Sequence, residues 1–361
     1  MSTPRFNTLK VKDVRRETEE CVSIAFDIPA ALEADYRFKE GQHLTLKTTI
    51  NGEEVRRSYS VCVSPLDGEL RVAVKKMYDG KFSSFANSHL KAGDELEVMT
   101  PMGKFHVELN PAQAKNYLAF AAGSGITPIM SIMKTILKTE PDSTFTLVFG
   151  NQNRNTIIFK EEIEGLKNRY MTRLSVYHIL SREIIDIPLF AGRIDKDKCL
   201  ALSNKLIDLN NIDDVFLCGP EEMIFNVKDV LTQAGMSDKQ IHFELFDTKR
   251  GDGKREKWLQ ENQADAGKMS KVTVRLDGVT FDMDVPYGGD TILDAALKHG
   301  ADLPYACKGG VCCTCKAKVT EGEVNMVLNY GLEPDEVEKK FVLTCQAHPQ
   351  SEKVFIDFDA R

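Results

Sequence analysis

Five of the nine cysteines in this 361-residue chain fall within a single stretch, from Cys307 to Cys345. Cys307, Cys312 and Cys315 follow the pattern C-x4-C-x2-C, and Cys345 lies thirty residues beyond Cys315. This is the spacing of plant-type [2Fe-2S] sites, in which two irons need four thiolates. Glycines at 309 and 310 let backbone N–H groups approach the cluster sulfurs. The pattern therefore predicts a [2Fe-2S] cluster held by Cys307, Cys312, Cys315 and Cys345.

Two other interpretations of these cysteines remain open: a zinc site and scattered structural thiols. Nine cysteines in a chain whose N-terminus carries no apolar signal segment favour metal or catalytic roles over disulfides. Cys313 does not fit the spacing and is interpreted as a bystander. The fourth ligand is distant in sequence, so the cluster is also expected to staple its domain.

A second set of residues has the chemistry of a flavin site. In Arg57-Ser58-Tyr59-Ser60, the Tyr ring can stack on a flavin, the Arg can pair with its pyrophosphate, and a hydroxyl can bond near its reactive nitrogen. About twenty residues later, Gly80-Lys81-Phe82-Ser83-Ser84 indicates a glycine turn that leads into a short helix, whose N-terminus suits phosphate. Each motif alone also fits an ordinary strand and turn, and only their order and spacing favour a flavin site.

Three further motifs indicate a nucleotide. Gly123-Ser124-Gly125-Ile126-Thr127-Pro128 follows an apolar strand, and glycines there let the chain approach a dinucleotide, although Pro128 replaces the last glycine of G-x-G-x-x-G. Ser181-Arg182 and Cys218-Gly219-Pro220 follow two other predicted strands, where open α/β sheets bind ligands. Arg182 could pair with a 2′-phosphate, which favours NADPH over NADH, and Cys218 could lie against the nicotinamide. The alternatives are a solvated surface charge and a buried structural thiol.

The elements that must position these residues divide the chain into parts. Residues 1–110 show short alternating strands with turn signals such as Asn51-Gly52, typical of a small barrel or sandwich, and residues 111–246 alternate strand and helix, typical of a doubly wound parallel sheet. Residues 247–270 are polar and predicted to be a linker, with Trp258 as a local anchor. Residues 271–361 begin with a hairpin at Asp277-Gly278, followed by a helix that Asp290 is expected to cap.

Charge and hydropathy exclude some functions and suggest a partner. The net charge of −7 gives no support to nucleic-acid binding, and no apolar run approaches the length of a membrane helix. Without a signal segment, the chain is expected in the cytoplasm. Residues 271–361 contain 10 Lys and Arg against 15 Asp and Glu, and so carry −5 of the −7. Such an acidic domain suits a partner with a basic docking face, although a merely soluble surface is an equal alternative.

Together these motifs resemble the ferredoxin-NADP reductase superfamily, in the class with a fused C-terminal plant-type ferredoxin. The resemblance implies a β-barrel FAD domain, an α/β doubly wound NAD(P)H domain and an α+β β-grasp ferredoxin domain. It places Tyr59, Ser60, Cys218 and Glu244 at the reacting atoms, and Phe246 as an aromatic near the flavin. The remaining cofactor-binding positions that it implies are Arg57, Ser58, Val74, Lys75, Gly80, Lys81, Phe82, Ser83, Ser84, Gly123, Gly125, Thr127, Pro128, Ser181, Arg182, Gly219 and Pro220.

The resemblance also implies an activity. NADPH, or less readily NADH, would reduce FAD, which would pass electrons singly to the cluster and then to a diiron oxygenase component. Gly322-Glu-Val-Asn-Met, Asn329-Tyr330 and Cys345-Gln346 are similar to the reductases that serve phenylacetyl-CoA epoxidation, with Cys313 where glycine is usual. The alternatives are a reductase of a steroid or ring hydroxylase, of a small carrier or quinone, or a non-catalytic redox sensor.

Overall fold

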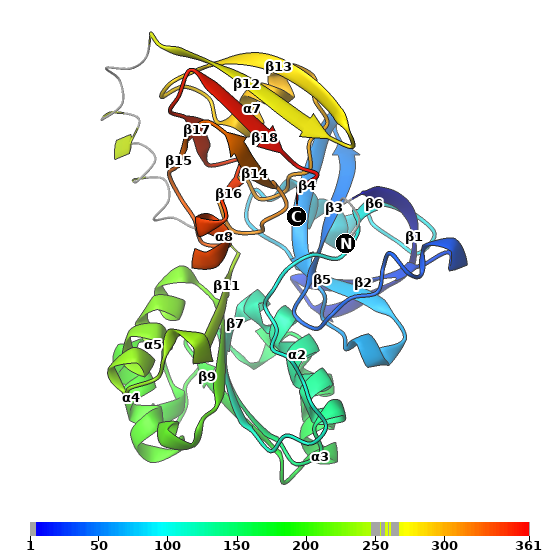
Figure 1. Ribbon diagram of the computed structural model, residues 1–361. Helices are drawn as coiled ribbons and strands as arrows, with labels where there is room; N and C mark the ends of the chain where they lie inside the picture. Colours follow the sequence, from blue (N-terminus) through cyan, green and yellow to red (C-terminus); the bar gives the residue numbers. More distant parts are fainter. Residues whose placement is uncertain (1–4, 247–252, 254–256, 259, 261–266, 361) are drawn as a thin grey trace. The chain divides into compact units, whose positions relative to one another are not determined.

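The described residues fold into three large β-sheets and one small two-stranded sheet, in two compact units (Figure 1). The structure is a computed structural model that describes residues 5–246, 253, 257–258, 260 and 267–360. One unit, formed by Asn7–Val55 and Tyr59–Phe246, contains the first two sheets, and the other contains the C-terminal sheet. Each unit has a hydrophobic core of its own. Most of the expected linker 247–270 lies outside the described residues, and the domain boundaries inferred from the sequence stay predictions.

The first sheet is a strongly curled antiparallel sheet of six strands in the order β4-β3-β6-β1-β2-β5. Just beyond β4, a bridge between Val61 and Val72 brings the two edges together, which gives the predicted barrel. Asn51 and Gly52, both at positive φ, form the tight turn between β3 and β4 that their sequence predicts. The elements are β1 (Phe6–Thr18), β2 (Cys21–Asp27), β3 (His43–Ile50), β4 (Glu53–Ser60), β5 (Leu70–Lys75), β6 (Glu95–Met99) and the helix α1 (Lys81–Ser88).

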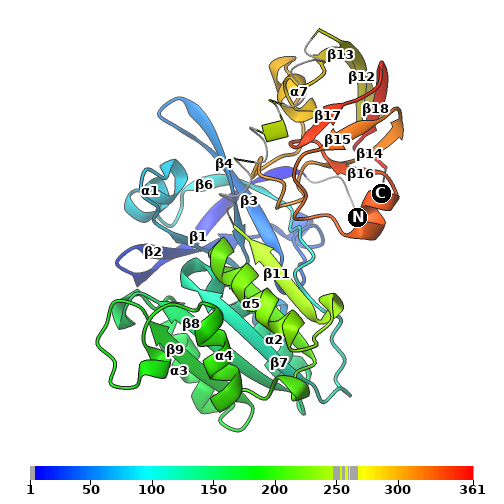
Figure 2. The same ribbon diagram turned by 90° about the vertical axis from the view of Figure 1, so that its left-hand side faces the viewer.

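The second sheet is parallel throughout, in the order β11-β10-β7-β8-β9. Its strands are β7 (Asn116–Ala122), β8 (Thr144–Asn151), β9 (Leu174–Leu180), β10 (Asp214–Gly219) and β11 (Ile241–Leu245). One face is covered by α2 (Ile126–Thr139) and α3 (Lys160–Arg169), the other by α4 (Lys196–Lys205) and α5 (Glu221–Gln233) (Figure 2). The doubly wound sheet is therefore confirmed, and its order reverses beside β7, where such sheets bind ligands.

The third sheet is mixed, with the order β13-β12-β18-β14-β16 and the parallel pair β12–β18 near its centre. The hairpin at Asp277-Gly278 is confirmed, because Leu276 pairs with Val279 across two residues at positive φ. The elements are β12 (Met269–Leu276), β13 (Val279–Pro286), β14 (Lys316–Glu321), β15 (Val324–Met326), β16 (Phe341–Leu343), β17 (Ala347–Pro349), β18 (Lys353–Asp357), α7 (Ile292–Lys298) and α8 (Pro334–Glu338).

One local prediction differs from the structure. The N-cap of α7 is Thr291, whose hydroxyl accepts from the Asp294 N–H, and Asp290 instead pairs with Lys298, so the prediction that Asp290 caps this helix was wrong. A Thr hydroxyl satisfies the same orphan donor as a carboxylate, so the two neighbouring residues compete for the position. Helix α2 begins at Ile126, two residues before Pro128, which lies in its first turn where proline is tolerated.

Helix α2 is the most deeply enclosed element of the larger unit. Every residue from Ile126 to Leu137 is buried, and polar side chains as well as apolar ones contact the barrel. Ser131 donates to the Val63 carbonyl at 2.6 Å, and Thr135 donates to the Ser64 hydroxyl at 2.9 Å. The Lys134 ammonium lies 2.6 Å from both Asp67 of the barrel and Glu162 of α3. Helix α2 therefore joins the second sheet to the barrel.

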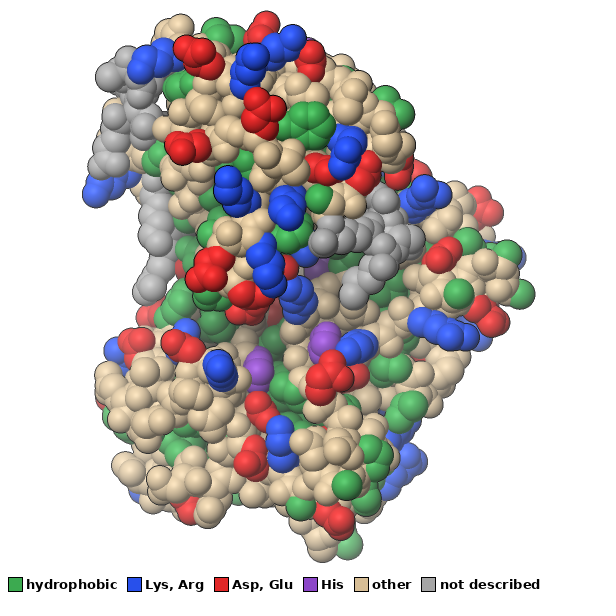
Figure 3. Space-filling view, viewed as in Figure 1, with side chains coloured by type: hydrophobic (Ala, Val, Ile, Leu, Met, Phe, Trp, Pro, Cys, Tyr) green, Lys and Arg blue, Asp and Glu red, His purple; other side chains and the backbone are tan. Residues whose placement is uncertain are grey.

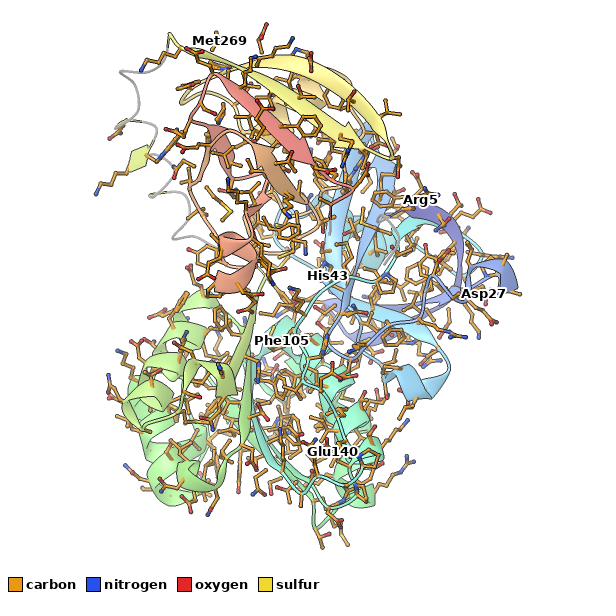
Figure 4. All side chains as sticks on the ribbon, in the orientation of Figure 1. Arg5, Asp27, His43, Phe105, Glu140 and Met269 are labelled. Carbon is orange, nitrogen blue, oxygen red and sulfur yellow. The ribbon has the colours of Figure 1, made fainter. Side chains whose placement is uncertain are left out.

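A second buried connection lies at the start of the same sheet. Glu140, fully buried and labelled in Figure 4, accepts hydrogen bonds from the Asn110 N–H and the Gln113 amide, which belong to the segment between barrel and sheet. It also accepts from the Tyr117 and Ser143 hydroxyls. Four donors on one buried carboxylate satisfy its lone pairs, as burial of a charge requires.

We expect Lys134→Met to lower the free energy of unfolding by about 2–4 kcal/mol, because removing one partner of a buried ion pair leaves an uncompensated charge. Methionine keeps most of the aliphatic stem, so the loss reports the ammonium rather than packing. Chemical denaturation followed by flavin absorbance measures it.

Lys138→Met is the matched control, because Lys138 contacts the same Asp67 from a more exposed position. Exposed pairs contribute about 0–1 kcal/mol. Equal losses in the two variants would contradict the role given to Lys134.

Candidate flavin, nucleotide and iron–sulfur site

The predicted flavin residues lie at the end of β4. Along this strand Arg57 is exposed, Ser58 and Tyr59 are half-buried, and Ser60 is buried. The Tyr59 ring lies 5.4 Å from the ring of Phe82, which is buried in the barrel core and belongs to α1. Phe82 therefore packs against the Tyr59 ring and holds it in place. The Arg57 and Tyr59 side chains are both accessible to a flavin.

The turn before α1 has the predicted form. Gly80 precedes the helix, and a Cβ there would lie 2.3 Å from the Ser83 hydroxyl and 3.0 Å from the Met77 Cβ, so a side chain would crowd the turn. Ser83 accepts from the Met77 N–H at 3.1 Å and donates to the Gly80 carbonyl at 3.2 Å, which closes the loop. Ser84 is half-buried in the first turn. The turn thus presents a helix N-terminus, the ordinary setting for a phosphate.

The two nucleotide motifs are pressed against each other. A Cβ on Gly125 would lie 2.0 Å from the Cys218 carbonyl oxygen, and one on Gly219 would lie 3.1 Å from the Ala122 nitrogen. The Thr127 hydroxyl donates to the Ser124 carbonyl and holds the first turn in place. Lys75, at the end of β5, points its ammonium at this turn, since a Cβ on Gly123 would lie 3.7 Å from the amine. A cation beside a glycine turn suits a diphosphate.

Glu244, in β11, lies at the centre of a buried polar cluster. Its Oε2 accepts from the Ser60 hydroxyl at 2.9 Å, and its Oε1 lies 3.9 Å from Nδ1 of His43 in β3. Burial raises the pKa of Glu244 to about 7, against the smaller opposite effect of the Ser60 hydrogen bond. Burial also lowers the pKa of His43 to about 4. The structure therefore brings two of the predicted site residues, Ser60 and Glu244, together and adds His43.

Cys218 lies directly beside this cluster in the sheet. In the parallel register it pairs with Glu244 on one side and with Ala121 on the other. Burial, reinforced by the neighbouring Glu244 charge, raises the pKa of the Cys218 thiol well above its usual value. Cys218 is therefore a neutral thiol at physiological pH, suited to contact and ordering of a ring rather than to nucleophilic attack.

Ser181 and Arg182 continue directly from β9. Their backbone N–H groups donate to the carbonyls of Asn151 and Gln152, so the pair extends the sheet edge, and the Arg182 side chain is exposed. The adjacent Glu183 would repel a phosphate, but it accepts from the backbone N–H and the side chain of Arg154. The local charge of Glu183 is thus compensated, while Arg182 stays accessible. Pro220 caps α5, and Phe246, after β11, is exposed.

The four predicted cluster cysteines fall into two neighbouring pairs. The Cys312 thiol hydrogen-bonds Cys307, and with backbone N–H groups it lowers the pKa of Cys307 to about 6. The hydrogen bond between Cys315 and Cys345, together with burial, raises the pKa of Cys315. Among the described residues, no three His, Cys, Asp or Glu side chains are grouped closely enough to hold a single metal ion. Two pairs of thiols instead suit two irons, each with two protein thiolates.

The loop around these cysteines is shaped for sulfur. Backbone N–H groups of Gly309 and Cys312 point at the Cys307 sulfur, 3.3 and 3.5 Å away. Gln346, next to Cys345, donates to the Lys308 carbonyl at 2.7 Å and fixes the loop. Cys313 takes a left-handed conformation, with φ of 55°, and its sulfur lies toward the Val311 carbonyl. These contacts support its interpretation as a bystander.

Comparisons with known proteins agree with this three-part arrangement. Residues 8–107 match the family model of an oxidoreductase FAD-binding domain, residues 120–229 that of an oxidoreductase NAD-binding domain, and residues 274–350 that of a 2Fe-2S iron-sulfur cluster binding domain. A component of the 1,2-phenylacetyl-CoA epoxidase of Escherichia coli K12 is 46% identical over 99% of this chain and 98% of its own. The chain belongs to the ferredoxin-NADP reductase superfamily.

One further relative and one solved structure of similar fold span nearly the whole chain. The ferredoxin reductase component of the 3-ketosteroid-9-alpha-monooxygenase of Rhodococcus rhodochrous is 32% identical over 97% of this chain and 96% of its own. Phthalate dioxygenase reductase, described as modular for electron transfer from pyridine nucleotides to [2Fe-2S], has a similar fold, with a TM-score of 0.58 at 20% identity over 98% of each chain.

Membership in this superfamily confirms the predicted activity and cofactors. The protein is an NAD(P)H-dependent flavin and iron–sulfur oxidoreductase, with FAD, a [2Fe-2S] cluster and a pyridine nucleotide as its cofactors. The individual site residues remain predictions. No helix in the described part of the chain is long and apolar enough to cross a membrane.

Sequence reasoning missed His43. It begins β3, a strand that mixes apolar and polar residues, and no motif includes it. The one available signal was a titratable side chain within a run of buried strand residues, which requires a buried partner. That partner, Glu244, lies 201 residues later in the sequence.

We expect Cys345→Ser to remove the visible absorbance of the cluster while leaving the flavin reducible by NADPH. A serine alkoxide is a poor substitute for thiolate on iron, and the second thiol pair would lose one member. Absorbance and electron paramagnetic resonance after anaerobic reduction measure both properties.

Cys313→Ser is the matched control, because it removes a neighbouring sulfur that lies toward the Val311 carbonyl and does not fit the ligand spacing. This variant should keep the cluster signal. Cluster spectra that survive in Cys345→Ser, or vanish in Cys313→Ser, would refute the ligand assignment.

Proposed function

We propose that this protein delivers electrons from NADPH to a diiron oxygenase, and that this oxygenase acts on phenylacetyl-CoA. The observation that carries the proposal is the 46% identity with the epoxidase component over 99% of the chain, which includes the cluster unit as well as both nucleotide-binding parts. A reductase of a steroid monooxygenase is the second candidate, favoured by a relative of 32% identity. The redox-sensor alternative loses its support, because all three parts match enzyme domains or their electron carrier.

The residues divide the work among three sites. Tyr59 would stack on the flavin, and Arg57 and the Gly80 turn would hold its phosphates. Lys75 would hold a diphosphate at the Gly123 turn. Ser60 and Glu244 would adjust the flavin's protonation, and Cys218 would order the nicotinamide beside it. When bound, FAD takes a hydride from the nicotinamide and releases electrons one at a time to the cluster. The protein's own contribution is to position these groups and to control the proton.

The acidic C-terminal part supports a charged docking partner. Its net charge of −5 would attract a basic face on the oxygenase and speed encounter at low ionic strength. On the face shown in Figure 3, Asp and Glu side chains alternate with Lys and Arg rather than gathering into one patch. We therefore propose that electrostatic steering of the oxygenase is moderate, and that shape as well as charge sets the specificity of docking.

A cytoplasmic location remains our proposal. The described cysteines, including the buried Cys21, Cys62, Cys199 and Cys218, are all free thiols. Unpaired thiols and an iron–sulfur cluster suit a reducing compartment.

The oxygenase proposal predicts selective coupling. Mixed with NADPH, phenylacetyl-CoA and the oxygenase component of phenylacetyl-CoA epoxidase, the reductase should support product formation, measured by chromatography of the CoA esters. With the oxygenase of ketosteroid monooxygenase and its steroid, turnover should be at least about tenfold lower, a difference of roughly 1.4 kcal/mol in productive docking.

The Cys345→Ser variant is the control, since it keeps the flavin and should reduce no oxygenase. Equal support of both oxygenases, or better support of the steroid enzyme, would overturn the phenylacetyl-CoA proposal. In each case ferricyanide reduction establishes that the reductase itself is active.

NADPH preference predicts a selective effect of Arg182→Ala. A charge-assisted hydrogen bond contributes about 1.5–3 kcal/mol, so the KM for NADPH should rise roughly 10–100-fold while the KM for NADH changes little. Steady-state ferricyanide reduction with each nucleotide measures the ratio. Arg169→Ala, at the exposed end of α3, is the matched control and should alter neither constant. Equal effects of Arg182→Ala on both nucleotides would rule out a 2′-phosphate role.

A further inference from the structure

Helix α1, labelled in Figure 2, is bound to the barrel through its C-terminal end. Nη2 of Arg16, in β1, donates at 2.7 Å to the Asn87 carbonyl, which lies in the last turn of the helix. Carbonyls of a last turn have no donor within the helix, so the Arg16 guanidinium satisfies one of them from a neighbouring strand. At the other end, no side chain of the described residues caps the first N–H groups. That end is therefore suited to an anionic ligand.

Asn87 joins this helix to the strand that precedes it. The residue is 8% exposed, and its amide nitrogen donates to the Val74 carbonyl at 3.0 Å and to the Ser83 carbonyl at 2.9 Å. Its amide oxygen accepts from Nη1 of Arg16 at 3.0 Å. Val74 belongs to β5, before the Gly80 turn, and Ser83 belongs to α1, after it. One buried side chain thus holds the two ends of the turn together.

The Gly80 turn has further contacts that fix its course between these two ends. The Lys76 N–H, where the chain leaves β5, donates at 2.7 Å to the Glu20 carbonyl of the turn between β1 and β2. Within the Gly80 turn, the Ser83 hydroxyl bonds to the Met77 N–H and the Gly80 carbonyl. The shape of the turn therefore depends on Asn87 at its base and on Ser83 inside it.

A turn that binds phosphate through backbone N–H groups gains affinity when those groups are directed before the ligand arrives. A turn that becomes ordered only on binding loses part of its affinity to the entropy of ordering. Both donors of the Asn87 amide are already used, by the Val74 and Ser83 carbonyls, and an amide nitrogen has no third. Asn87 is therefore suited to shape the turn rather than to contact a ligand.

We propose that Asn87, supported by Arg16, is a positioning residue for the diphosphate of FAD. It fixes the start of α1 relative to the end of β5, and so directs the N–H groups of the Gly80 turn toward the phosphates. This inference rests on the proposed role of the Gly80 turn in holding the phosphates of the flavin. Asn87 acts through the backbone of that turn.

A pair of ligands separates this role from a general contribution to folding. FAD carries the diphosphate, whereas riboflavin has the same ring system without any phosphate. A defect confined to the Gly80 turn weakens the binding of FAD and leaves the binding of riboflavin unchanged. A general loosening of the barrel weakens the binding of both.

Three substitutions and one control are made in the full-length protein. Asn87→Ala removes both amide donors, and Asn87→Asp keeps the size of the side chain and an acceptor for Arg16 but loses the donors. The Asp variant preserves the test if the Ala variant does not fold. Arg16→Met keeps the aliphatic stem and removes the guanidinium. Asn116→Ala is the matched control, because Asn116 lies at the start of β7, outside the barrel, and accepts from the Thr144 hydroxyl at 2.7 Å.

The first measurement is the Kd for each ligand, from quenching of flavin fluorescence by protein that has been freed of flavin and retains its cluster. The wild type should bind FAD at least about 100-fold more tightly than riboflavin, since the phosphates add charge-assisted hydrogen bonds. Asn87→Ala and Asn87→Asp should each raise the Kd for FAD about tenfold, the order expected for two lost neutral hydrogen bonds, and change that for riboflavin less than about twofold.

The two remaining variants set the scale. Arg16→Met should raise the Kd for FAD only about threefold, because Asn87 keeps its own bonds to Val74 and Ser83. Asn116→Ala should change neither Kd. Gly80→Ala, which crowds the turn itself, should weaken the binding of FAD at least as much as Asn87→Ala does.

The second measurement examines the bound cofactor directly. Phosphorus NMR of the FAD-saturated protein should show shifted diphosphate resonances in Asn87→Asp, while the visible absorbance of the flavin ring stays as in the wild type. With FAD in excess, the KM for NADPH in ferricyanide reduction should also stay unchanged, because the nucleotide motifs belong to the second sheet.

The outcomes distinguish this inference from the proposed function on which it rests. An unchanged Kd for FAD in both Asn87 variants, or equal weakening of FAD and riboflavin binding, would overturn the positioning role of Asn87. A comparable loss in Asn116→Ala would overturn it as well. If the wild type bound riboflavin as tightly as FAD, or if Gly80→Ala left the Kd for FAD unchanged, the Gly80 turn itself would lose its proposed role in holding phosphate.

Discussion

The burial of helix α2 on all sides is the constraint on which the larger unit depends. A helix with one apolar stripe can tilt against its sheet, but α2 is enclosed from Ile126 to Leu137 and is tied to the barrel by Ser131, Lys134 and Thr135. Its burial fixes the position of the nucleotide sheet against the flavin barrel. Hydride transfer requires reacting atoms within about 3–3.5 Å, so a fixed position favours the reaction more than a flexible one.

The same constraint explains why titratable groups can be buried nearby. Glu244 and Ser60 come from different sheets, so their hydrogen bond forms only when barrel and nucleotide sheet are packed together. Packing excludes water, and the exclusion is what raises the pKa of Glu244 and lowers that of His43. A more open junction would return both groups to ordinary values and remove a base that is ready to act near neutral pH. The rigid packing of barrel against sheet is therefore the cause of the shifted pKa values of Glu244 and His43.

Features set by short stretches of sequence could be predicted, and those set by distant contacts could not. The turns at Asn51-Gly52 and Asp277-Gly278 and the alternation of β7 to β11 follow from local conformational preference. The cluster site could likewise be predicted from a short stretch, because Cys307, Cys312 and Cys315 lie close together in the sequence. His43 had no such signal, because its meaning depends on Glu244 in another sheet. The prediction of the α7 N-cap was wrong for a different reason. Asp290 and Thr291 are both favourable N-cap residues, and the backbone conformation decides which of them caps the helix.

The segment at Cys345 and Gln346 both supports the cluster loop and supplies one of its predicted ligands. Lys308 and Cys313 both have positive φ, which costs a residue with a side chain about 1 kcal/mol or more. Some of this strain must be offset by contacts from elsewhere. Gln346 supplies one of these, through its hydrogen bond to the Lys308 carbonyl, and its neighbour Cys345 is the predicted fourth ligand. Because Gln346 and Cys345 are adjacent, the contact that supports the strained loop also holds the predicted fourth ligand close to it.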